Sequence, residues 1–97
     1  MKQSEIREWA EECAGMTPET QFTDDELDHV AMCLHHIDRW YHEGYPIGDF
    51  LTAVVRDEFV NACCLADDTN RKALYIYALF VHNKLGDDYK KKALASS

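Results

Sequence analysis

The chain has 97 residues and a mass of 11.2 kDa, which allows one hydrophobic core and leaves no room for a second domain. Hydrophobic residues make up 46% and charged residues 29%, and the low numbers of proline and glycine exclude collagen-like and low-complexity classes. No apolar run reaches the roughly 18 residues of a membrane span, and acidic residues stand where a signal peptide needs an apolar core. We therefore expect a soluble protein of the cytoplasm with no membrane partner.

The charge is negative and unevenly distributed. The chain has 18 acidic and 10 basic side chains, and its formal net charge is −8. Residues 1–49 hold 12 acids and three bases, whereas residues 50–97 hold six acids and seven bases. Nucleic-acid binding needs clustered cations, so no direct contact with nucleic acid is expected. The negative electrostatic field of the first half of the chain favours a basic partner. The same charge also keeps a small protein soluble.

Apolar stripes and helix-stop signals predict four main helices, in chain order near residues 4–14, 24–43, 49–65 and 69–85. The first has apolar residues at helical spacing on one face and glutamates on the other. The second has the clearest start, a capping box with Thr23 at the N-cap and Glu26 three residues later, and it ends at Gly44.

The third predicted helix has the widest apolar arc, which predicts the most buried element of the fold. Residues 66–70, Ala-Asp-Asp-Thr-Asn, separate it from the fourth helix, which Asp67 or Asp68 would cap. The tail, about residues 87–97, is expected to be frayed. Short links between these helices predict an all-α fold, a small single-domain bundle of about four helices in which neighbours are mostly antiparallel.

A second stripe runs along the second predicted helix, away from its core side. His29, Cys33 and His36 fall at positions i, i+4 and i+7, and Trp40 continues the line. The first three side chains are of the kinds that bind zinc. They spread over two helical turns, however, and no fourth ligand is obvious, so we expect no metal and no other cofactor. Two uses stay open: packing within the chain, or a contact surface for a partner or a second copy, which Met32, His36 and Trp40 would form.

The sequence gives little support to catalysis. It contains no nucleophile elbow, Walker loop, dinucleotide-binding glycine motif or zinc-protease motif. The four cysteines are expected to be free thiols, mostly buried and therefore inert. Helix capping and exposed faces account for the adjacent acidic pairs. We expect a protein that is not an enzyme and has no catalytic residue.

Residues 44–54, the segment 66–70 and the stretch from Tyr77 to Asn83 resemble small proteins encoded by phages and prophages. Members share a G-x-P-x-G-x-F-L-x-A-V segment and an A-D-D-x-N segment, and both occur here within residues 44–83. The resemblance implies no catalytic residue. It implies a protein that occupies the surface of a host protein, and some such proteins resemble nucleic acid in their charge, as many anti-CRISPR proteins do.

Together these features predict a non-enzymatic phage- or prophage-type protein in the host cytoplasm, which binds a host protein with a basic surface. Its acidic face would comprise the first helix, the connection 16–22 and the start of the second helix. The candidate partner-binding residues are Glu8, Glu11, Glu12, Glu19, Asp24, Asp25 and Asp28, together with Met32, His36 and Trp40. The alternatives are a structural or oligomeric accessory protein whose charge only solubilises it, and a binder of a small ligand or metal.

Overall fold

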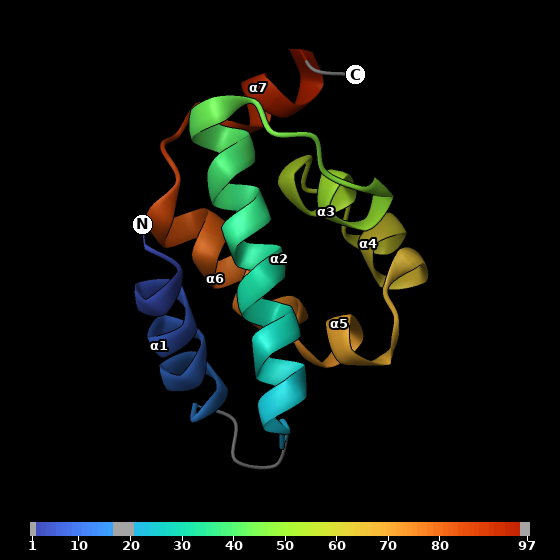
Figure 1. Ribbon diagram of the computed structural model, residues 1–97. Coiled ribbons are helices and arrows are strands. Elements are labelled where there is room, and N and C mark those ends of the chain that lie inside the picture. Colours follow the sequence, from blue (N-terminus) through green and yellow to red (C-terminus); the bar gives the residue numbers. More distant parts are fainter. Residues whose placement is uncertain (1, 17–20, 96–97) are drawn as a thin grey trace.

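The structure is a computed structural model that describes residues 2–16 and 21–95 (Figure 1). These residues form seven helices and contain no strand. In chain order the helices are α1 (Gln3–Ala14), α2 (Asp24–Glu43), α3 (Asp49–Val55), α4 (Phe59–Leu65), α5 (Asp68–Lys72), α6 (Leu74–Lys84) and α7 (Tyr89–Ala95). The all-α class is confirmed, and the helices are more numerous than the four predicted.

The two ends of α2 follow directly from local sequence signals. The Thr23 hydroxyl oxygen accepts a hydrogen bond from the Glu26 N–H at 3.1 Å, and the Glu26 carboxylate accepts one from the Thr23 N–H at 2.9 Å. This reciprocal pair is the predicted capping box. At the other end Gly44 adopts a left-handed conformation with φ 73°, which a residue without a Cβ reaches at little cost.

The predicted helix 49–65 is two helices because the chain turns sharply at Asp57. This residue has φ 59°, a left-handed conformation that is uncommon outside glycine. Its carboxylate accepts the Tyr89 hydroxyl at 2.9 Å and pairs with Lys90 Nζ at 3.4 Å. Both partners belong to α7, so a helix in the tail that was expected to be frayed contacts the turn between α3 and α4.

The predicted helix 69–85 is likewise divided, with a tight turn at Ala73 between α5 and α6. Asp67 caps α5, because its side chain accepts the Asn70 N–H at 2.7 Å. Asn70 is buried, and its Oδ1 accepts the hydroxyl of the fully buried Tyr77 at 2.6 Å. The Ala-Asp-Asp-Thr-Asn segment therefore forms a cap and satisfies a buried hydroxyl, which are structural roles.

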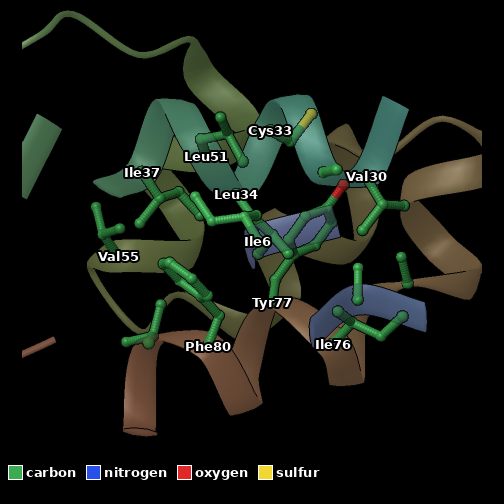
Figure 2. Close-up of a cluster of buried hydrophobic side chains, with 14 of the residues drawn as sticks. Ile6, Val30, Cys33, Leu34, Ile37, Leu51, Val55, Ile76, Tyr77 and Phe80 are labelled. Carbon is green, nitrogen blue, oxygen red and sulfur yellow. The ribbon is translucent and has the colours of Figure 1, made fainter. Parts of the chain in front are cut away.

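The longest helix, α2, lies at the centre of the molecule (Figure 1). An antiparallel α1 runs along one side, α3 and α4 lie on the other, α6 passes behind, and α7 lies near the C-terminal end of α2. The buried cluster draws side chains from α1, α2, α3, α6 and α7. Figure 2 labels members from the first four of these helices; the largest fully buried ones are Tyr77, Phe80, Ile6, Leu34, Ile37 and Ile76.

The helix α4 contributes no residue to this cluster, and only Ala62 within it is buried. The expectation that residues 49–65 form the most buried element is therefore wrong for their second half. Within the part of the chain that the structure describes, no helix is both long and apolar enough to cross a membrane.

Candidate functional site

The antiparallel packing of α1 on α2 gathers acidic side chains from two segments onto one surface. α1 buries Ile6, Ala10 and Cys13, and its glutamates at helical spacing point away from that side. The first turns of α2 add three aspartates. We call the resulting surface the acidic face; its members are all exposed and are Glu8, Glu11, Glu12, Asp24, Asp25 and Asp28. Glu19, also a candidate, lies outside the described residues.

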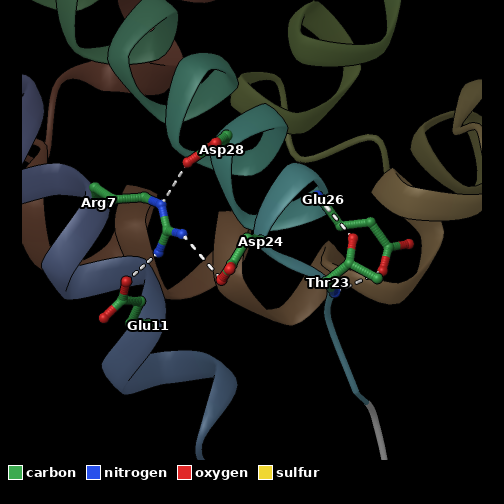
Figure 3. Close-up of polar contacts among 6 residues, drawn as sticks. All are labelled: Arg7, Glu11, Thr23, Asp24, Glu26 and Asp28. Atoms are coloured by element: carbon green, nitrogen blue, oxygen red, sulfur yellow. Dashed lines mark hydrogen bonds and ion pairs between the residues drawn. The ribbon is translucent and has the colours of Figure 1, made fainter.

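Arg7 lies among these carboxylates and joins α1 to α2 (Figure 3). Its Nε donates a hydrogen bond to Asp28 Oδ1 at 2.8 Å, its Nη1 pairs with Glu11, and its Nη2 lies 3.8 Å from Asp24 Oδ1. The bond to Asp28 is the largest cause that raises the pKa of Arg7. This role of Arg7 was not predicted from the sequence, although the i,i+4 spacing of Arg7 and Glu11 signals one of the pairs.

The network divides the acidic face into two groups. The side chains of Glu11, Asp24 and Asp28 share one guanidinium yet remain 56%, 98% and 68% exposed. The other group, Glu8, Glu12 and Asp25, has no ion-pair partner among the described residues. One cation therefore fixes part of the face in place without neutralising it.

The three other candidate residues lie further along α2, and they differ in how far they are exposed beside the acidic face. Met32 follows Asp28 by one turn and is 41% exposed. His36 is half-buried with its ring 5.3 Å from that of Tyr45, and burial is the main cause that lowers its pKa. Trp40 is only 7% exposed and belongs to the buried cluster. The prediction that Trp40 is a contact residue for a partner is therefore corrected, because the indole packs within its own chain.

The candidate metal ligands on α2 do not converge. Cys33 Sγ lies 3.7 Å from His29 Nε2, but the cysteine is buried and its burial raises the pKa of the thiol. A raised thiol pKa disfavours both a nucleophile and a thiolate ligand. Among residues 2–16 and 21–95, no group of three or more His, Cys, Asp or Glu side chains is arranged to hold a metal ion.

A cleft of about 640 Å³ lies near the far end of α2, against α3, α7 and the link 44–48. Its cation, Lys92, donates a hydrogen bond to the carbonyl of Tyr41 at 3.1 Å and lies 4.3 Å from the centre of the Tyr41 ring. Aromatic and backbone groups of the same chain therefore already engage this charge, and we assign the cleft no ligand.

The acidic face is thus the one feature in the described residues that the sequence predicted as a site and that the fold also assembles. Its carboxylates are exposed, and two packed helices and Arg7 set their positions. Comparison of the chain with protein-family models, with curated proteins and with solved structures finds no match.

Proposed function

We propose that this chain is a non-enzymatic phage- or prophage-type protein that binds a host protein with a basic surface through its acidic face, in the host cytoplasm. In the sharpest form of the proposal, carboxylates occupy the positions that phosphates take in a basic groove. Arginine pairs bidentately with either anion, so such a protein competes with nucleic acid. It would then inhibit a defence system of the host, as anti-CRISPR proteins do.

The observation that carries the proposal is the gathering of six exposed carboxylates on two antiparallel helices. Single exposed ion pairs are worth only about 0–1 kcal/mol, so affinity requires several pairs at once. Three of the six, Glu8, Glu12 and Asp25, have no ion-pair partner in the described chain. They are therefore the groups that meet a partner's arginines without first breaking a pair.

Two further features support binding over solubilisation alone. The Arg7 network holds the side chains of Glu11, Asp24 and Asp28, and the packing of α1 on α2 fixes the backbone positions of all six carboxylates before any partner arrives, which reduces the entropy lost on association. Met32, exposed one turn beyond Asp28, supplies an apolar anchor next to the charges. An accessory protein that needs charge only for solubility requires neither feature.

The test is a charge reversal confined to one surface. The variant Glu8→Lys/Glu12→Lys/Asp25→Lys leaves the Arg7 network intact, so it should fold like the wild type, as circular dichroism can establish. The matched control is Glu43→Lys/Asp68→Lys/Asp87→Lys, three exposed positions outside the acidic face. Each triple change moves the formal net charge from −8 to −2. The control also removes the ion pairs of Glu43 with Arg39 and of Asp68 with Arg71, so it is the harsher change and must also fold like the wild type by circular dichroism.

In a CRISPR-interference assay in cells, the wild type and the control should protect a targeted phage, and the acidic-face variant should not. With a purified CRISPR effector complex as probe, association should slow as salt rises, because steering is screened over about 8–10 Å. If the acidic-face variant keeps full activity, the acidic face does not bind the partner and its charge serves only to keep the protein soluble. A wild type without effect on interference would contradict the anti-CRISPR form of the proposal.

A further inference from the structure

The helix α4 is mostly apolar, yet the fold covers only the side that carries the buried Ala62. Its sequence is Phe-Val-Asn-Ala-Cys-Cys-Leu, in which only Asn61 is strongly polar, and successive residues are turned by about 100°. Phe59 and Val60 are each 71% exposed and Leu65 is 52% exposed. A helix that is hydrophobic all round is normally buried, and a large exposed apolar patch marks an interaction surface.

A groove of about 580 Å³ lies beside this helix. Residues of α3, α4, α5 and α6 line it, and Tyr89 of α7 also contributes. Many of the lining side chains are small and apolar: Ala53, Val54, Ala62, Ala78 and Val81. Phe59 lines the groove and is strongly exposed. A protruding ring and a hollow with small side chains therefore lie next to each other.

The charges around the groove are balanced, unlike those of the acidic face. Asp57 and Glu58 precede α4, whereas Arg71 and Lys72 line the groove from α5. Each makes an ion pair within the chain and keeps between 36% and 58% of its side chain exposed. Such a surface does not select a basic partner. It complements a surface that carries both signs in the same arrangement, which a second copy supplies.

We propose that two copies of this chain associate through α4 about a two-fold axis, with Phe59 of each copy seated in the groove of the other. In a two-fold interface the same patch serves on both sides, so it must carry a protrusion and its hollow, and both signs of charge. The surface around α4 has all of these. Figure 1 places α1 and α4 on opposite sides of α2, so this association leaves the acidic face uncovered and does not depend on the proposed function.

Sedimentation equilibrium under reducing conditions tests the association. The wild type should approach twice the 11.2 kDa mass of one chain at high concentration and dissociate on dilution. The variant Phe59→Glu/Val60→Glu should stay monomeric and folded, because both side chains are largely exposed within one chain. Met16→Glu/Met32→Glu is the matched control, two exposed apolar side chains changed outside α4, and it should associate like the wild type.

A second measurement locates the contact. Cys64 is exposed and lies one turn beyond Val60 on α4, its neighbour Cys63 is half-buried, and Cys13 and Cys33 are buried. A short thiol-specific cross-linker should therefore join two copies of the Cys63→Ser variant through Cys64, and Cys63→Ser/Cys64→Ser should abolish the product. A wild type that stays monomeric at high concentration would overturn the proposal. So would association that persists in Phe59→Glu/Val60→Glu, or a dimer that yields no Cys64 cross-link.

Discussion

Glu26 on α2 and Lys72 on α5 are 46 residues apart in the chain, and Lys72 Nζ lies 2.9 Å from the Glu26 carboxylate. The same carboxylate accepts the Thr23 N–H, so one side chain closes the capping box of α2 and joins α2 to α5. The hydrogen bond from Lys72 is the largest of the causes that lower the pKa of Glu26 from 4.5 to about 2. Charge removal at Glu26 therefore affects both a helix end and a contact between helices.

This pKa predicts how stability depends on pH. The folded value lies below the unfolded one, so the contribution of Glu26 to the free energy of unfolding is complete above about pH 4.5 and is lost as pH falls towards 2. Glu26→Gln should be less stable than the wild type at pH 7, and the two stabilities should converge over that interval. Urea unfolding at several pH values measures this, with Asp25→Asn as the control, which removes an equal charge without an ion pair. A difference independent of pH would contradict it.

The cap of α2 gives a second prediction. Thr23→Ala removes the oxygen that accepts the Glu26 N–H and should lower the free energy of unfolding by about 1 kcal/mol. Thr23→Ser keeps the oxygen and should stay close to the wild type. Urea denaturation followed by circular dichroism distinguishes the two. Equal stability of all three proteins would mean that α2 does not depend on this cap.

The buried pair of Tyr77 and Asn70 gives a third prediction. Burial is the main cause that raises the pKa of Tyr77 above its ordinary value, and the hydroxyl donates to Asn70 Oδ1 at 2.6 Å. Asn70→Ala removes that acceptor and should lower the free energy of unfolding by about 1–3 kcal/mol, because a buried hydroxyl loses its acceptor.

Tyr77→Phe completes a double-mutant cycle for this contact. The loss in Asn70→Ala/Tyr77→Phe should be smaller than the sum of the two single losses, since the double variant leaves no hydroxyl without its partner. Thermal and urea unfolding of the four proteins provide the values. Strict additivity would show that the two side chains are not coupled, contrary to the short contact between them.

The burial of Trp40 gives a fourth prediction. In a Trp9→Phe background its fluorescence should be blue-shifted and weakly quenched by acrylamide, because only 7% of the residue is exposed. Trp40→Glu places a charge in the buried cluster and should destabilise the fold strongly. A red-shifted and fully quenchable indole in a folded protein would contradict this placement. Trp9 must be replaced first, because it is also partly packed, with its ring 5.5 Å from that of Phe80.

The fold was predictable where its signals lie within a few residues of one another. The stripe of Ile6, Ala10 and Cys13 and the capping box at Thr23 and Glu26 place α1 and α2 almost to the residue. The breaks in the later helices were not predictable in this way. Asp57 is turned into a left-handed conformation where Tyr89 and Lys90 contact it, and both come from a distant part of the chain.

The candidate site was predictable to a similar degree. Helical spacing alone puts Glu8 and Glu12 on the outside of α1. It does not reveal that Arg7 turns towards Asp28, or that Trp40 is covered, because both outcomes depend on which helix packs against which side of α2.

By itself, therefore, the sequence determined the all-α class, the ends of α2 and the concentration of acidic residues in the first half of the chain, since caps, periodicity and charge act locally. Only the tertiary structure decided that Arg7 joins two segments of the acidic face, and that the apolar helix α4 is left exposed beside a groove. The physical reason is that burial and ion pairing are properties of pairs of segments. An apolar stripe is buried only where another segment of the chain covers it.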